Sequence, residues 1–167
     1  MIRVDRGDEP AALATARARR LPRAIAAVLA HGAPSPALTD ELTGYDAGDV
    51  KAELYKRQHK KCAWCARRRD FSSSPVEHYR PKNGAWRHRR GEPRQVSAGH
   101  YWWLTWEWTN LLFACPRCND KGHKGNYFPL APDTREADVP AAPAAGASLD
   151  VGVDLGVEHP LLLDPST

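Results

Sequence analysis

The chain has 167 residues, of which 42% are hydrophobic and 26% are charged, and it contains 6 tryptophans. This composition excludes a disordered or fibrous protein and allows one domain with an ordinary core. No apolar run approaches the roughly 20 residues that cross a bilayer. The acidic start MIRVDRGDEP is unlike a secretory or transit peptide, so we expect a cytoplasmic protein without a membrane segment.

The net charge of +4 conceals a strongly basic middle. Residues 51–126 carry 17 Lys and Arg against 6 Asp and Glu, a net charge of +11, whereas residues 1–50 and 127–167 carry −1 and −6. A positive field of this size attracts polyanions, and nucleic acid is the commonest partner for such a density of Arg and Lys. A solvated surface balanced by the acidic tail is the alternative.

Helices are predicted before the basic middle. Residues 10–31 are rich in Ala, and Pro22 should divide them into two helices that end at Gly32. The two prolines that follow predict a short loop. Apolar residues recur on one side of residues 47–60, so a further helix should lead the chain to Cys62.

The second half of the chain has fewer regular patterns. Residues 83–100 are rich in Gly, Arg and His and predict an irregular basic loop. Beyond residue 130, a Pro/Ala/Gly-rich segment predicts a linker, and the last residues, VEHPLLLDPST, predict a short apolar strand. Residues 101–113 should be buried as core rather than stack on bases, because apolar residues flank their four tryptophans, Trp102, Trp103, Trp106 and Trp108.

All 4 cysteines lie in the basic middle, in the pairs Cys62-Ala-Trp-Cys65 and Cys115-Pro-Arg-Cys118. In a reducing compartment, two Cys-x-x-Cys pairs favour a structural zinc over disulfides or a redox site. Four thiolates leave no open coordination position on the metal. This zinc would therefore stabilise the fold rather than take part in a reaction.

A carboxylate and an imidazole are adjacent at Glu77 and His78, in a segment that favours extended backbone. At a strand end or a tight turn, both side chains can reach one centre. Cleavage of a phosphodiester needs a base for water and a divalent cation for the phosphate charge. A neutral imidazole suits the first role and a carboxylate oxygen suits Mg²⁺ in the second. An ordinary salt-bridged pair is the alternative.

The order EH…NL…CxxCN…K, formed by Glu77, His78 and residues 108–126, resembles the HNH nucleases. The segments CAWC, VEHYRPK, YWWLTWEWTNLLFACPRCN, KGNYFPL and EHPLLLDP narrow the resemblance to one bacterial HNH family. That family includes the nuclease subunits of Septu-type antiphage defence systems. The resemblance covers about residues 40–165 and implies an α+β, mainly helical chain around a ββα-metal (HNH) site, with a structural zinc held by four cysteines.

The resemblance assigns a role to each matching position. His78 matches the general base, Glu77 the acidic Mg²⁺ ligand before it, and Asn110 the middle Asn that fastens the loop between the strands. Many HNH sequences have Asp where this chain has Glu77. Asn119 matches the second ligand to the catalytic Mg²⁺ or Mn²⁺, although His123 could replace or supplement it if the helix continues. We also expect five basic residues near these positions to bind phosphate: Arg67, Arg68, Arg69, Arg80 and Lys82.

The expected organisation is an N-terminal helical region (1–46), an HNH nuclease core with zinc knuckles (47–130), and a linker with a C-terminal segment (131–167). The expected function is metal-dependent endonucleolytic cleavage of phosphodiester bonds, most readily in DNA. The resemblance implies antiphage defence with an ATPase partner of the ABC/SMC type, and a family C-terminus that extends beyond DPST. No element resembles a base-reading module, so selection of a target should come from the assembly.

The alternative is a non-catalytic, zinc-dependent subunit that binds nucleic acid or another protein. Glu77 discriminates between the two, because a carboxylate beside a phosphate repels it unless a cation intervenes.

Overall fold

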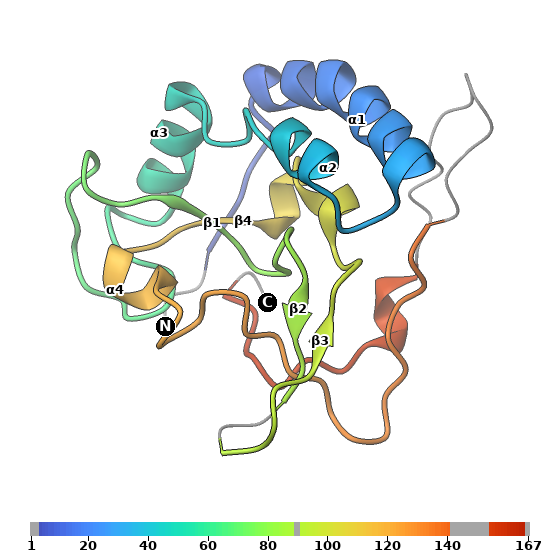
Figure 1. Ribbon diagram of the computed structural model, residues 1–167. Helices are drawn as coiled ribbons and strands as arrows, with labels where there is room; N and C mark the ends of the chain where they lie inside the picture. Colours follow the sequence, from blue (N-terminus) through green and yellow to red (C-terminus); the bar gives the residue numbers. More distant parts are fainter. Residues whose placement is uncertain (1–3, 89–90, 141–153, 166–167) are drawn as a thin grey trace.

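The computed structural model describes residues 4–88, 91–140 and 154–165. Three helices, α1 (Ala11–His31), α2 (Pro36–Glu41) and α3 (Gly48–Arg57), precede two small sheets and a short helix, α4 (Pro116–Asn119). Helices α1 and α2 lie side by side along one edge of the molecule, and α3 and α4 lie on another side (Figure 1). No helix in these ranges combines the length and the apolar surface that a bilayer crossing requires.

Helix α1 runs without interruption through Pro22, so the prediction of two helices was wrong. A proline inside a helix costs about 3 kcal/mol, because it removes a hydrogen bond and crowds the preceding turn. Buried residues on both sides of the proline, such as Leu13 and Ile25, hold the two halves against one core. Gly32 ends the helix with a positive φ of 74°, and its N–H donates to the Val28 carbonyl.

Helix α2 begins at Pro36, one of the two prolines for which a short loop was predicted. Its N-terminus has a favourable local pattern, because the Oγ atom of Ser35 accepts a hydrogen bond from the N–H of Leu38 at 3.2 Å. Pro36 follows at the first turn, where its missing N–H has no helical partner to lose. Helix α3 is shorter than the predicted 47–60 and buries Val50 and Leu54.

The strands form two separate antiparallel pairs. Strand β1 (Val76–His78) pairs with β4 (Leu111–Phe113), so that Glu77 lies opposite Leu112. Strands β2 (Ala85–Trp86) and β3 (Val96–Ser97) form a second pair within the predicted irregular loop. Three short 3₁₀ helices complete the described elements: η1 (Trp102–Leu104), η2 (Trp108–Asn110) and η3 (Leu155–Val157). The fold is therefore a mixture of helices and small sheets.

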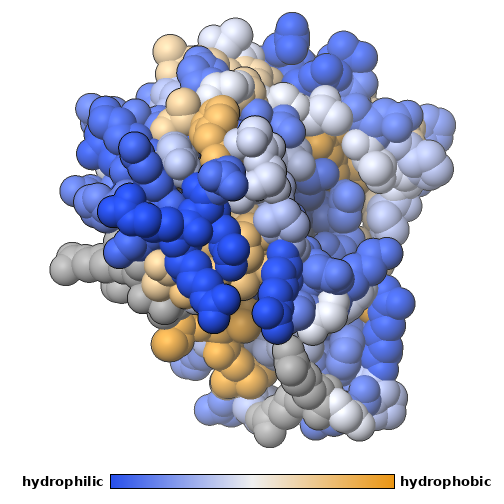
Figure 2. All heavy atoms as spheres, turned by 90° about the vertical axis from the view of Figure 1, so that its left-hand side faces the viewer, coloured by the Kyte–Doolittle hydropathy of each residue, from blue (hydrophilic) through white to orange (hydrophobic). Residues whose placement is uncertain are grey.

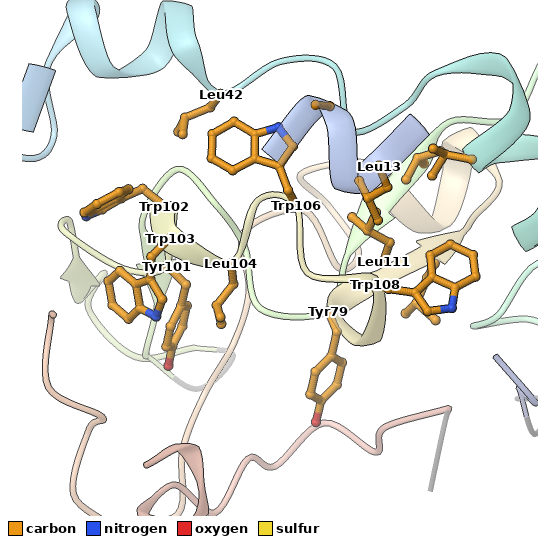
Figure 3. Packing of buried hydrophobic residues seen from close by; sticks show 14 of the residues in the cluster. Leu13, Leu42, Tyr79, Tyr101, Trp102, Trp103, Leu104, Trp106, Trp108 and Leu111 are labelled. Carbon is orange, nitrogen blue, oxygen red and sulfur yellow. The ribbon is translucent and has the colours of Figure 1, made fainter. Parts of the chain in front are cut away.

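The aromatic segment that precedes β4 forms the centre of the core, as predicted. Trp102, Trp103 and Trp106 are at most 2% exposed. They belong to one apolar cluster with Leu13 of α1 and Leu111 of β4 (Figure 3). The N-terminal helices and the central segment therefore share a single core.

The C-terminal residues were predicted to form an apolar strand, and this prediction was wrong. Residues 155–157 form η3 instead, and the described part beyond it makes one isolated bridge, between Leu130 and Pro160. Leu161 and Leu163 are 48% and 73% exposed. The apolar residues that suggested a strand therefore have no neighbouring strand to pair with in the described part of the chain.

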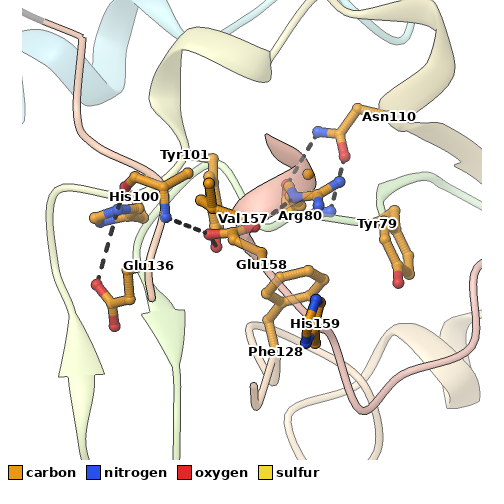
Figure 4. Close-up of polar contacts among 12 residues, drawn as sticks. Tyr79, Arg80, His100, Tyr101, Asn110, Phe128, Glu136, Val157, Glu158 and His159 are labelled. Atoms are coloured by element: carbon orange, nitrogen blue, oxygen red, sulfur yellow. Dashed lines mark hydrogen bonds and ion pairs between the residues drawn. The ribbon is translucent and has the colours of Figure 1, made fainter. Parts of the chain in front are cut away.

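Glu158 anchors this C-terminal segment to the loop after β1 (Figure 4). Its side chain is fully buried and accepts hydrogen bonds from Arg80 Nε at 2.9 Å and from the backbone N–H of Ala137 at 3.0 Å. The hydroxyl of Tyr101 donates to the same carboxylate. The Arg80 guanidinium also lies 5.4 Å from the ring centre of Phe128. This ion pair joins segments that are 78 residues apart.

Replacing Glu158 with alanine should therefore destabilise the chain by about 3–5 kcal/mol, because it leaves the Arg80 charge buried without a partner. Urea unfolding would measure the loss. Asp138→Ala is the control, because Asp138 pairs with Arg135 at the surface, where the two side chains are 81% and 69% exposed. This control should change stability by at most about 0.5 kcal/mol. Equal effects of the two substitutions would contradict the anchoring role.

Candidate active site and metal centre

The four cysteines converge into one cluster, although the two pairs come from distant segments. Their Sγ atoms all lie within 4.8 Å of one another, and Cys65 Sγ and Cys115 Sγ are 4.0 Å apart. A tetrahedral zinc with Zn–S bonds of about 2.3 Å would separate its sulfurs by about 3.8 Å. All four cysteines are free thiols. The cluster therefore has the donor set and the spacing to hold a zinc ion, as the sequence predicted.

Hydrogen bonds favour the metal-binding thiolate form at Cys65, whereas burial raises the pKa of Cys62 and that of Cys118. The backbone N–H of Cys115 donates to Cys62 Sγ at 3.3 Å, and Arg69 lies 3.9 Å from Cys65 Sγ. Burial by itself would raise the pKa of Cys65, but hydrogen bonds from the Arg67 backbone and the Arg69 side chain lower it to about 6. Because zinc binds the thiolate, these contacts prepare Cys65 for the metal.

The cluster is joined to the β1–β4 sheet by Gln58, which is fully buried at the end of α3. The Gln58 amide donates to the carbonyl of Phe113 at 2.8 Å and accepts from its N–H at 2.7 Å. The N–H of Ala63, next to Cys62, donates to the same carbonyl. On the other side, β4 runs through Ala114 into Cys115. The metal centre and the sheet therefore form one unit.

Glu77 and His78 both lie on β1 and are 8% and 5% exposed. Glu77 Oε1 accepts a hydrogen bond from Lys124 Nζ at 2.7 Å, and the same ammonium donates to the carbonyl of His78. Burial raises the pKa of Glu77 and lowers that of Lys124, while their proximity opposes both changes. Lys124 therefore neutralises the carboxylate. Lys124 was not among the predicted site residues, although it lies within residues 108–126, which carry the CxxCN…K part of the motif.

The His78 imidazole is held in one orientation. Its Nε2 atom lies 3.0 Å from the carbonyl of Thr105, which can only accept, so Nε2 carries the proton. The ring also makes an edge contact with Tyr45. The ammonium of Lys82 lies over the Tyr45 ring. Burial lowers the pKa of His78 to about 3, so the ring is neutral at pH 7. Its Nδ1 atom is then the proton acceptor.

Asn110 fastens the loop that follows β1. Its Oδ1 atom accepts a hydrogen bond from the N–H of Arg80 at 2.8 Å, and its amide donates to the carbonyls of Arg80 and Leu104 (Figure 4). Arg80 lies two residues after His78. The Asn110 side chain thus joins the loop after β1 to the segment that precedes β4.

Among the described residues, no hydrogen bond links Asn119 or His123 to Glu77 or His78. Asn119 is half-buried at the last position of α4, and the helix ends there. Because α4 ends at Asn119, no helical spacing brings His123 to the same side as Asn119. His123 is exposed. The carboxylate of Glu77 and the amide oxygen of Asn119 are nevertheless the donor types that Mg²⁺ prefers. A divalent cation held by these donors would compete with Lys124 for the Glu77 carboxylate.

The five basic residues expected to bind phosphate differ in availability. Arg67 and Arg68 are exposed on the side of the molecule that carries α3 and α4, where strongly hydrophilic residues cluster (Figure 2). Arg69 contacts the cysteine cluster, and Arg80 is engaged by Glu158. Lys82 is partly buried over Tyr45. A phosphate contact by Arg80 would compete with Glu158, whereas the Nε atom of Arg69 has no hydrogen-bond partner.

One curated relative resembles this chain. Over 97 residues, it is 36% identical to the Septu protein PtuB of Bacillus mycoides (strain KBAB4). The matched segment covers 58% of this chain and 32% of PtuB, so the chain spans about a third of the length of this relative. No family model matches the sequence, and no solved structure matches it. The identity supports the relation to Septu-type proteins that the motifs indicated.

Proposed function

We propose that this chain is the zinc-stabilised HNH endonuclease part of a Septu-type antiphage defence protein, and that it hydrolyses phosphodiester bonds in DNA. One observation carries the proposal: Glu77 and His78 lie on a strand whose partner runs directly into the four-cysteine cluster. The order of strand, strand and short helix agrees with a ββα-metal site. The identity to PtuB supports the defence context.

In this proposal, His78 is the general base and its Nδ1 atom takes the proton from the attacking water. Thr105 fixes the ring through Nε2, and Asn110 fixes the loop behind it. Glu77 and Asn119 would hold the catalytic Mg²⁺ or Mn²⁺, which when bound neutralises charge on the phosphate and the leaving oxygen. Arg67, Arg68 and Lys82 would position the nucleic-acid backbone, while Arg80 would support the surrounding structure.

A second candidate function is a zinc-dependent subunit that binds nucleic acid without cutting it. Two observations favour it: the His78 ring is almost fully buried, and Lys124 already neutralises Glu77. The repulsion that would exclude phosphate from Glu77 is therefore weaker than the sequence alone suggests. Plasmid cleavage with Mg²⁺ or Mn²⁺, against the same protein without added cation, separates the two functions. Binding without cleavage under every cation would favour the second.

We expect the isolated chain to cleave DNA weakly, because Tyr45 and the Thr105 carbonyl contact the His78 ring. We expect no sequence preference, because phosphate contacts carry no sequence information. Co-expression with a neighbouring ATPase gene of the ABC/SMC type should give a co-purifying complex that cleaves faster. Affinity should fall steeply as salt rises, because backbone contacts release counterions. Robust, sequence-specific cleavage by the isolated chain, without co-purification, would contradict dependence on a partner.

Asn119→Ala should raise the Mg²⁺ concentration needed for half-maximal cleavage more than His123→Ala does. Asn119 directly follows Cys118 and is held by the cysteine turn, whereas His123 lies beyond the end of α4 and is exposed. Cleavage rates across a Mg²⁺ titration of the two variants would measure the difference. The reverse order would transfer the ligand role to His123.

A further inference from the structure

The side of the molecule that carries α3 and α4 contains a pocket of about 380 Å³ that is separate from the residues around His78. It lies between the end of α3, the loop after the first cysteine pair and the start of α4. Its volume is in the range of small-molecule binding sites, which start at about 300 Å³. The lining includes six polar or charged residues: Lys60, Arg68, Arg69, Asp70, Ser73 and Ser74.

The charge of the pocket favours an anion. Lys60, Arg68 and Arg69 contribute three positive charges, and the carboxylate of Asp70 contributes the one negative charge in the lining. Lys60 and Arg68 are exposed, and neither forms an ion pair with another residue in the described ranges. Their charged groups are therefore available to a ligand.

Two buried polar atoms in the lining lack a hydrogen-bond partner. Ser74 is 1% exposed, and its hydroxyl has no partner in the protein. The Nε atom of Arg69 is also buried and unpartnered, while another nitrogen of the same guanidinium contacts Cys65 Sγ. Leaving such a group unsatisfied costs about 1–3 kcal/mol, so native structures usually provide a partner for it. The residues that carry these two atoms line the pocket beside the two free cations, a combination that fits an oxyanion.

We propose that this pocket binds a phosphate group of a nucleic-acid strand and anchors that strand beside Glu77 and His78. Arg and Lys donate charge-assisted hydrogen bonds to phosphate, and a serine hydroxyl can complete the set. That the phosphate belongs to a nucleic-acid strand rests on the proposed function. The pocket itself requires only a phosphate ligand.

Along the chain, the pocket residue Ser74 lies close to Glu77 of the candidate active site. Ser74 precedes Glu77 by three residues, which span about 10 Å in extended backbone. Phosphates follow one another at about 3.4 Å along the axis of one DNA strand. The length of chain between Ser74 and Glu77 therefore corresponds to about three nucleotides of one DNA strand.

The pocket also depends on the cysteine cluster. Arg69 joins the two, because its guanidinium lines the pocket and contacts Cys65 Sγ. Pro116, which follows Cys115, also lines the pocket. Zinc at the cluster would therefore hold these two lining residues in place.

The test is binding of a labelled single-stranded oligonucleotide to the zinc-loaded full chain, by fluorescence anisotropy without added Mg²⁺. Lys60→Ala and Arg68→Ala should each weaken binding about tenfold and reduce the dependence on salt by about one phosphate contact. Lys56→Ala is the matched control, because it removes the same charge from a side chain on α3 that is 75% exposed and outside the pocket. This control should change affinity less than about twofold.

Ser74→Ala provides a variant that does not change the charge. It should weaken binding about threefold and leave thermal stability unchanged or raised, because the hydroxyl has no partner in the free protein. Titration with inorganic phosphate should shift the backbone NMR signals of Arg69 and Ser74. Equal affinity for oligonucleotides with and without a 5′-phosphate assigns the pocket to a backbone phosphate, and tighter binding of the phosphorylated strand assigns it to a terminal one.

The pocket proposal is overturned if Lys60→Ala matches Lys56→Ala and inorganic phosphate shifts neither signal. That result would leave the nuclease assignment untouched, because cleavage that depends on His78 is measured separately. Conversely, the chain could fail to cleave DNA while the pocket variants still lose binding. That result would retain the pocket and overturn the proposed function.

Discussion

A Cys115→Ser chain is expected to lose its zinc and most of its stability. Cys115 supplies one of four buried or half-buried sulfurs that lie within 4.8 Å of one another. Binding of structural zinc contributes about 10–16 kcal/mol in small zinc domains, which is comparable to the whole stability of a typical domain. Metal analysis and thermal unfolding by circular dichroism would measure both losses, and the wild-type chain should contain one zinc.

Ala114→Ser is the matched control, because Ala114 is fully buried next to Cys115 but contributes no ligand. It should retain the zinc and cost about 1–3 kcal/mol for the buried hydroxyl. A Cys115→Ser chain that kept one zinc and unfolded at the wild-type temperature would contradict the assignment. Two intact disulfides in the mass spectrum of the wild-type chain would also contradict it.

Cleavage by His78→Ala should be at least about a hundredfold slower than cleavage by the wild-type chain, because general-base catalysis contributes this much. DNA affinity and zinc content should stay close to the wild-type values, since His78 contacts neither the cysteine cluster nor the basic pocket. Plasmid cleavage, anisotropy and metal analysis on the same preparation would test all three. A variant that cut at the wild-type rate would remove His78 from the mechanism.

Burial of His78 calls for two further variants. His78→Gln retains much of the volume and a donor for the Thr105 carbonyl, so it should fold even if the alanine variant does not. It should remain inactive, because an amide does not accept a proton from water. His159→Ala removes an exposed histidine and should leave cleavage unchanged.

The features that could be predicted from sequence are those with strong local signals. The Cys-x-x-Cys spacing predicted the cluster, because two residues between cysteines allow one turn to present both sulfurs to a metal. The tryptophans of residues 101–113 predicted burial, because so much apolar surface must leave water. The adjacent Glu77 and His78 were recognised as a pair, although their surroundings were not.

The features that were missed depend on residues far apart in the chain. Lys124 reaches Glu77 across 47 residues, and Glu158 reaches Arg80 across 78. A single sequence contains no local pattern that links such partners. Pro22 misled for a related reason, because the apolar face of α1 packs against the core on both sides of the proline and overrides its local effect.

Gln58 protects one edge of the two-stranded β1–β4 sheet. A two-stranded sheet has an open edge on each strand, and an exposed edge can pair with another molecule and lead to aggregation. The Gln58 amide donates and accepts at Phe113 as a neighbouring strand would. One side chain therefore closes the outer edge of β4 at that residue. Intermolecular strand addition is blocked where the strand leads into the cysteine cluster.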